Sequence, residues 1–177
     1  MITGKDAKGN KKRGFTLIEL LSVVLIFTIL LGIGVYSLKN LGEVSSESEA
    51  QRIVSLLNVW RESAISTQSS ILVRRIGRGF GVSRLRAGFG EQHFANYNFV
   101  KLRFGISLAT RGVEEALGVI ESDGVVFPND ILIFDRRGGA VAGAFYLTDG
   151  RLDFAIGVTP SGRIKLWRWR NGAWREG

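Results

Sequence analysis

Residues 11–21 read KKRGFTLIELL and decide how the chain begins: three cations and a glycine precede an apolar run that contains one carboxylate, Glu19. From Leu20 to Leu38 no side chain is charged. As a helix, this stretch would extend about 28 Å, close to the hydrocarbon thickness of a bilayer. The segment is therefore predicted to span a membrane, and Glu19 needs an explanation because a charge is costly in lipid.

Two ordinary membrane-targeting segments are alternatives. A cleaved secretory signal also places basic residues before an apolar core, but such cores are usually about 7–15 residues long, and this one is longer and follows an acid. An uncleaved signal anchor with Lys11, Lys12 and Arg13 on the inner side fits the composition. Neither alternative accounts for Glu19.

The string RGFTLIELL, residues 13–21, resembles the cleavage and methylation motif of type IV prepilins and type II secretion pseudopilins. The resemblance implies that a prepilin peptidase removes a leader, residues 1–14, by cutting between Gly14 and Phe15, and methylates the new amino group of Phe15. It also implies that Glu19 pairs with this amine on an adjacent subunit and sets the axial register. The amine is mostly protonated because its intrinsic pKa is near 8, so the two charges would neutralise each other. Such head-to-tail contacts build an open helical filament.

The region after the apolar segment is predicted to be an amphipathic helix that ends at Gln68. Its apolar stripe is expected to pack against the following sheet, with contact to a partner helix as the alternative. The resemblance favours one long helix over residues 15–68, with its transmembrane part at about 15–38. The capping-box spacing of Ser46 and Glu49 would instead mark a separate helix start. The stripe consists of Ala50, Ile53, Leu57, Trp60 and Ala64.

Residues 69–177 are predicted to form a globular β domain, because short apolar runs with period two alternate with turn residues. Turns at Asp149-Gly150, Pro160-Ser161-Gly162 and Asn171-Gly172 make the carboxyl half an expected antiparallel meander. The predicted strands are Ile71–Arg75, Asn98–Phe104, Val125–Phe127, Ile131–Phe134, Ala144–Thr148, Leu152–Val158 and Arg163–Trp169.

The stretch from Phe134 to Lys165 resembles the GspH/FimT-like domain of minor pseudopilins and minor pilins. It has a strand ending in FD, a Gly-rich turn, the sequence GAFYLTDG, an apolar strand and a Gly-Arg-x-basic ending. The fold class that this resemblance implies is α+β, with a long amino-terminal helix packed on an antiparallel β-sandwich of two sheets. Residues 77–124 match little of that pattern.

The formal charge of +8 is concentrated at the two ends, since residues 1–14 and 160–177 carry +4 each. Cations interleaved with tryptophans in the tail suit single-stranded nucleic acid. Gly162-Arg163-Ile164-Lys165 also resembles the Gly-Arg-x-Arg motif implicated in DNA binding by FimT-like minor pilins, with lysine in the last place. The alternative is a strand whose cations pack on tryptophans or contact another subunit. In such a strand, alternation along RIKLWRWR would place Arg163 and Lys165 on one face and Arg168 and Arg170 on the other. The candidate DNA-binding residues are Arg163, Lys165, Arg168 and Arg170.

Few residues could carry catalysis. His93 is the only histidine and cysteine is absent, so Cys-His sites and metal sites with several imidazoles are excluded. His93 is expected on the surface, in a polar loop. Glu114 and Glu115 would point about 100° apart on a helix and would not cooperate. The glycines of GRGFG, residues 77–81, lack phosphate-binding spacing and predict a flexible loop. No catalytic residue, metal or cofactor is expected.

The sequence thus favours a minor pseudopilin, a non-enzymatic structural component of the type II secretion pseudopilus. Its expected location is the bacterial inner membrane, with a single span and the carboxyl-terminal domain in the periplasm. The expected partners are the prepilin peptidase, other pseudopilins or pilins in a helical filament, inner-membrane lipid and secreted cargo. The alternative is a minor pilin of a type IV pilus that binds DNA through its basic carboxyl-terminal region during DNA uptake.

Overall fold

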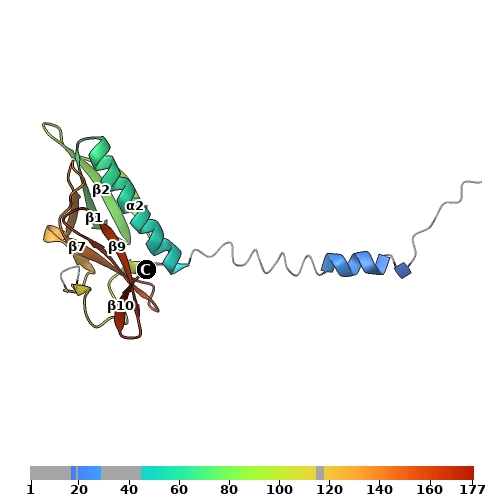
Figure 1. Ribbon diagram of the computed structural model, residues 1–177. Helices are drawn as coiled ribbons and strands as arrows, with labels where there is room; N and C mark the ends of the chain where they lie inside the picture. Colours follow the sequence, from blue (N-terminus) through green and yellow to red (C-terminus); the bar gives the residue numbers. More distant parts are fainter. Residues whose placement is uncertain (1–16, 19, 29–44, 115–117) are drawn as a thin grey trace, which may run out of the picture. The chain divides into compact units, whose positions relative to one another are not determined.

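The computed structural model describes residues 17–18, 20–28, 45–114 and 118–177. The chain divides into two units, Met1–Glu43 and Val44–Gly177 (Figure 1). In the first unit the described residues are helical, and their apolar side chains are exposed. Within the described ranges, no helix combines the length and the apolarity that crossing a bilayer requires. The transmembrane part predicted at about 15–38 falls only partly within these ranges.

The second unit begins with helix α2 (Ser46–Ser66), and Ser45 fixes its start. The backbone of Ser45 is extended (φ −67°, ψ 149°), and its hydroxyl oxygen accepts the Ser48 N–H at 3.1 Å. The helix expected over residues 15–68 is therefore interrupted at Ser45, because an extended residue breaks the helical hydrogen-bond pattern. The separate helix start that the spacing of Ser46 and Glu49 offered as the alternative is present, but Ser45 forms the cap, and the side chains of Ser46 and Glu49 bind elsewhere in the domain.

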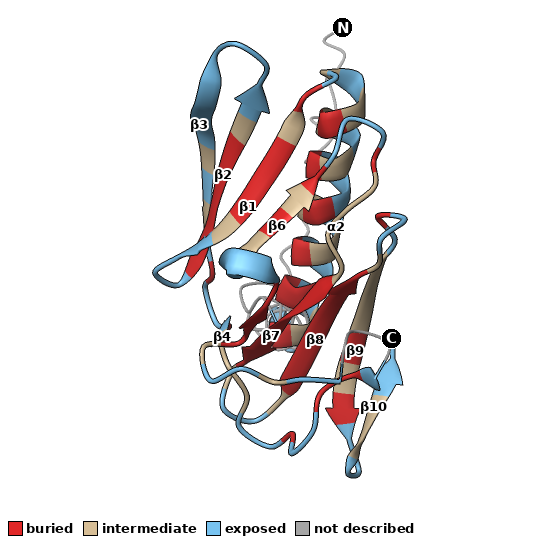
Figure 2. Ribbon diagram, turned by 90° about the vertical axis from the view of Figure 1, so that its left-hand side faces the viewer, coloured by how far each residue is buried: buried red, intermediate tan, exposed pale blue. Residues whose placement is uncertain are grey.

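The apolar stripe of α2 faces the core, as predicted. Figure 2 shows its buried residues as a band along the helix side that faces the sheets. Four of the five stripe residues are completely buried, and Trp60 is 6% exposed. The sequence prediction of sheet packing is confirmed, and the stripe is closed to a partner helix.

Two antiparallel sheets form the rest of the second unit, which confirms the predicted α+β class. The strand order is β3-β2-β1-β6 in one sheet and β10-β9-β8-β7-β4 in the other, where β5 also pairs with β7. A short 3-10 turn, η2 (Pro128–Asp130), precedes β6. The strands are β1 (Ser70–Ile76), β2 (Gly79–Arg86), β3 (Gly90–Asn98), β4 (Arg103–Phe104), β5 (Val125–Val126), β6 (Ile131–Phe134), β7 (Gly143–Thr148), β8 (Asp153–Val158), β9 (Ile164–Arg170) and β10 (Ala173–Glu176).

The carboxyl half is the predicted antiparallel meander, from β7 to β10. The Asn171-Gly172 pair connects β9 to β10 with positive φ at both residues (52° and 76°), as a two-residue hairpin turn requires. The sequence prediction did not include β10 itself, whose four residues are too few to show alternation.

The flexible loop predicted at residues 77–81 was wrong, because Gly79 and Gly81 belong to strand β2. A Cβ at Gly79 would lie 1.9 Å from the carbonyl oxygen of Tyr97 on β3, so glycine here permits close strand approach. Strand β3 was missed as well. It is an edge strand whose residues are mostly exposed, so it lacks the apolar alternation of a half-buried strand.

The strand predicted over Asn98–Phe104 is divided by a turn. Strand β3 ends at Asn98, and only Arg103 and Phe104 pair again, with β7. The N–H groups of residues 100–102 are bound by the side chain of Glu49 and are therefore not available to a β ladder.

The second sheet has an apolar layer on both faces. Alternation along β7 places Phe145 and Leu147 in the main core with α2, and Ala144 and Tyr146 in a second cluster. Trp167 of β9 belongs to the second cluster, which also includes Val113 from the 105–124 connection. Both clusters lie wholly within the second unit, so residues 44–177 contain a complete core of their own.

Candidate functional site

The residues predicted to act in processing and assembly, Gly14, Phe15 and Glu19, lie outside the described residues. The described part of the candidate site is the first turn of α2, where the second unit begins. Three side chains of this turn, Ser46, Glu47 and Glu49, each contact a different part of the β domain.

Glu49 is the most buried of these contacts, at 1% exposure. Its carboxylate accepts the N–H of Val100 at 2.5 Å and those of Lys101 and Leu102 at 2.8 and 3.0 Å. A buried carboxylate is costly unless hydrogen bonds replace its hydration, and three N–H donors do so here. Glu49 therefore fixes the helix to the turn between β3 and β4.

Two further contacts attach the first turn of α2 to the β domain. The Ser46 hydroxyl donates to the carboxylate of Asp149 in the β7–β8 turn. Burial raises the pKa of Asp149, but hydrogen bonds from Ser46 and from the backbone N–H groups of Arg151 and Leu152 outweigh burial, so the pKa lies below its ordinary value. Glu47 forms an ion pair with Arg168 on β9. The start of α2 is thereby attached to two adjacent turns and one strand.

A fourth carboxylate, Asp153 at the start of β8, organises the connection that follows β4. Asp153 is fully buried and accepts the N–H groups of Ser107, Leu108 and Ala109 at distances between 2.6 and 3.1 Å, and the Ser107 hydroxyl at 3.0 Å. Sequence reasoning did not identify Asp153 or Glu49 as structural centres. The available indication was an acid inside an otherwise apolar run, as in LDFAIGV, or beside the apolar stripe of a helix.

The candidate DNA-binding residues do not share one face of β9. Lys165 is paired with Glu176 at 2.9 Å, and its ammonium lies 5.6 Å from the centre of the Trp167 ring. Arg168 is directed to the opposite face, toward Glu47 on α2. The alternation predicted for RIKLWRWR is present, and it separates these two cations.

The other two candidates lie at opposite ends of the strand. Arg163 precedes β9 and Arg170 ends it, and both are exposed. Seven residue steps at about 3.3 Å each separate them by roughly 23 Å along the strand. The structure therefore does not bring the four residues together as one patch.

Gly162, the first residue of the Gly-Arg-x-basic sequence, has a structural role. Its φ is +76°, and a Cβ there would lie 1.9 Å from the carbonyl oxygen of Gly138. The same oxygen accepts a hydrogen bond from Arg61 Nε at 2.8 Å. The glycine is thus required where two turns and the end of α2 meet, independently of any ligand.

His93 lies on strand β3, not in a loop, and it is exposed as predicted. Its strand neighbourhood includes Glu91, which pairs with Arg74 at 2.8 Å. Among the described residues, no group of three or more histidine, aspartate or glutamate side chains is placed to hold a metal ion.

Comparison with known proteins identifies the amino-terminal segment. Residues 9–35 match the family model described as the prokaryotic N-terminal methylation motif. A search of curated proteins finds no significant sequence match.

Two solved structures of the minor pseudopilin EpsH from the type II secretion system of Vibrio cholerae are similar to this chain. One has 15% identity and a TM-score of 0.45, and the match covers 68% of this chain and 94% of that one. The other has 22% identity and a TM-score of 0.35, and covers 72% and 89%.

Proposed function

This chain carries an amino terminus of the prepilin type. We propose that it is a minor pseudopilin of a type II secretion system. In this role it is a non-enzymatic filament subunit, made as an inner-membrane precursor with its carboxyl-terminal domain in the periplasm. A prepilin peptidase cuts between Gly14 and Phe15 and methylates Phe15. Glu19 then pairs with the amine of a neighbouring subunit, and the protein acts through assembly with other pseudopilins and contact with secreted cargo.

The observation that carries the proposal is the methylation motif over residues 9–35. The motif combines a cationic leader, Gly14, Phe15 and the acid Glu19 before an uncharged run. Glu19 would be expensive in lipid without a counter-ion, and cleavage supplies one, the protonated amine.

The second unit supports a structural role. Its first helical turn is tied to the β domain by Ser46, Glu47 and Glu49, so the start of α2 is held in a fixed position within this unit. A filament subunit needs a domain of fixed geometry, because each step of the helical assembly repeats the same contacts.

Processing can be tested directly. Wild-type protein expressed with a prepilin peptidase is expected to yield a mature chain that begins at N-methylated Phe15, whereas Gly14→Val is expected to retain residues 1–14. Intact-mass measurement of the membrane fraction distinguishes the two products. A matched change in the leader, Gly9→Val, is expected to be cleaved normally. A wild-type chain that still begins at Met1 beside an active peptidase contradicts the proposal.

The assignment to secretion can be tested in a deletion strain. Loss of the gene is expected to abolish release of a type II secreted enzyme while DNA uptake stays intact. Wild-type protein and Glu62→Gln, an exposed site on α2, are expected to restore release. Glu19→Gln is expected to fail, because a neutral side chain cannot pair with the amine. Lost DNA uptake with normal secretion would identify a type IV pilus subunit instead.

A further inference from the structure

Five cationic side chains surround the first turn of α2, and we call them the basic collar: Lys101, Arg103, Arg151, Arg170 and Arg175. All five are exposed. None of them takes part in an ion pair within the part of the chain that the structure describes.

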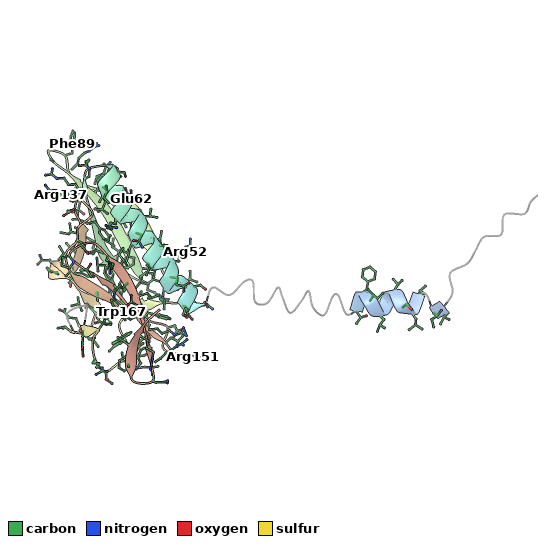
Figure 3. The ribbon with its side chains drawn as sticks, in the orientation of Figure 1. Arg52, Glu62, Phe89, Arg137, Arg151 and Trp167 are labelled. Carbon is green, nitrogen blue, oxygen red and sulfur yellow. The ribbon has the colours of Figure 1, made fainter. Side chains whose placement is uncertain are left out.

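The contacts of the first turn place these cations near the start of the helix. Lys101 belongs to the turn that Glu49 holds, and Arg151 belongs to the β7–β8 turn that contacts Ser46 through Asp149. Figure 3 shows Arg151 near the end of the second unit at which α2 begins, with Arg137 and Phe89 toward the other end.

The remaining three cations of the collar lie on β4 and on the β9–β10 hairpin. Arg103 on β4 pairs with Thr148 beside the β7–β8 turn. Arg170 and Arg175 line, together with Glu47, a cavity of about 230 Å³ between α2 and the β9–β10 hairpin.

The acids in this region are already engaged. Glu47 pairs with Arg168, and Glu176 pairs with Lys165. Glu49 and Asp149 accept backbone N–H groups. The five cations of the collar, together with Lys165 and Arg168, outnumber these four acids by three, so this end of the domain presents a positive charge to an approaching surface.

The sequence limits how far the collar can lie from the apolar segment. Six residues, 39–44, separate Leu38 from Ser45, and even a fully extended chain of that length reaches only about 25 Å. If residues 20–38 occupy the bilayer, as the proposed function requires, this tether keeps the collar close to the lipid headgroups at a high effective concentration.

We infer that the basic collar binds the phosphate groups of anionic phospholipids in the membrane that anchors the chain. Guanidinium groups donate paired hydrogen bonds to phosphate oxygens, and each cation close to an anionic surface adds to the attraction. The contact would hold the domain against the membrane before the subunit enters a filament. The inference rests on the proposed function for the tether, but the lipid affinity of the collar is a property of the second unit alone.

The test uses residues 44–177, which contain both apolar clusters of the second unit. Co-sedimentation with vesicles of phosphatidylcholine alone is compared with vesicles that also contain phosphatidylglycerol. Binding is expected only to the anionic vesicles, and it should weaken as salt is raised. The double variant Arg170→Ala/Arg175→Ala is expected to bind about fivefold more weakly per cation removed.

A matched control removes the same charge from the far end of the domain. Arg86 ends β2 and Arg137 follows β6, and both are exposed. Arg86→Ala/Arg137→Ala is expected to bind anionic vesicles as the wild type does. Equal losses in both double variants would show that only total charge matters, and binding to neutral vesicles or none at all would also overturn the inference. Cleavage after Gly14 is measured in a separate experiment, so a negative result for lipid binding by the basic collar would leave the proposed function intact.

Discussion

Asp153→Asn is expected to lower the free energy of unfolding of residues 44–177 by about 3–5 kcal/mol. The carboxylate is fully buried and accepts N–H groups from three successive residues, Ser107 to Ala109. Asparagine keeps the size but turns one oxygen into an NH₂ group, which would face N–H donors. At least one buried donor is then left without an acceptor. Urea unfolding followed by tryptophan fluorescence measures the loss.

Asp135→Asn is the matched control for this change. Asp135 also accepts backbone N–H groups, from Arg137 at 2.7 Å and Gly139 at 3.0 Å, but it does so within its own exposed turn. Water can replace those hydrogen bonds, so the expected loss is about 1 kcal/mol or less. Equal losses for the two variants would show that Asp153 does not organise residues 107–109.

The carboxylate of Asp153 also makes the stability of the second unit depend on pH in the acidic range. Burial raises the pKa of Asp153, but the surrounding hydrogen-bonding groups, the Thr148 side chain and the N–H groups of Ala109, Leu108 and Ser107, lower it by more. The folded-state pKa therefore lies below the ordinary 3.8, and the unfolded chain binds more protons in that interval. The stabilisation is complete above pH about 5 and is lost as the pH falls further. Asp153→Asn should show a shallower loss there.

Glu49→Gln is expected to destabilise the second unit by about 2–4 kcal/mol. Glutamine preserves the volume and one acceptor oxygen, yet its NH₂ group replaces an oxygen that accepts a backbone N–H from the turn at residues 100–102. The first turn of α2 should then separate from that turn before the rest of the domain unfolds. Hydrogen exchange at Val100, Lys101 and Leu102 is expected to accelerate more than exchange in β7 and β8.

Glu62→Gln on the same helix is the control, because Glu62 is exposed and its replacement should change stability by no more than about 0.5 kcal/mol. If Glu49→Gln were as stable as Glu62→Gln, the buried carboxylate would not anchor the helix. The fixed attachment of the first turn of α2 to the β domain would then lose its main support.

Local sequence patterns predicted much of the second unit correctly. The stripe from Ala50 to Ala64 identified the buried face of α2, because helical periodicity alone decides which side chains share a face. Period-two alternation and the Asn171-Gly172 pair identified the meander. These features depend only on neighbouring residues, so they can be read without the fold.

The failures concern residues whose surroundings come from distant parts of the chain. The sequence around Gly79 predicted a loop, because no local pattern shows that the carbonyl of Tyr97 lies beside this glycine. Strand β3 is polar and lacks apolar alternation because it lies at the edge of its sheet. The predicted alternation along β9 is present, but only the structure shows that Glu47 and Glu176 each hold one of the tail's cations, on opposite faces of the strand.

The sequence by itself determined the amino-terminal motif, the apolar segment, the helical stripe and the β-rich class, because each is encoded in the order and spacing of adjacent residues. Only the tertiary structure decided where α2 begins and which acids hold the domain together. Glu49 finds its donors 51–53 residues away, and Asp153 finds its donors 44–46 residues away. A carboxylate's role depends on which N–H groups surround it, and folding alone brings them there.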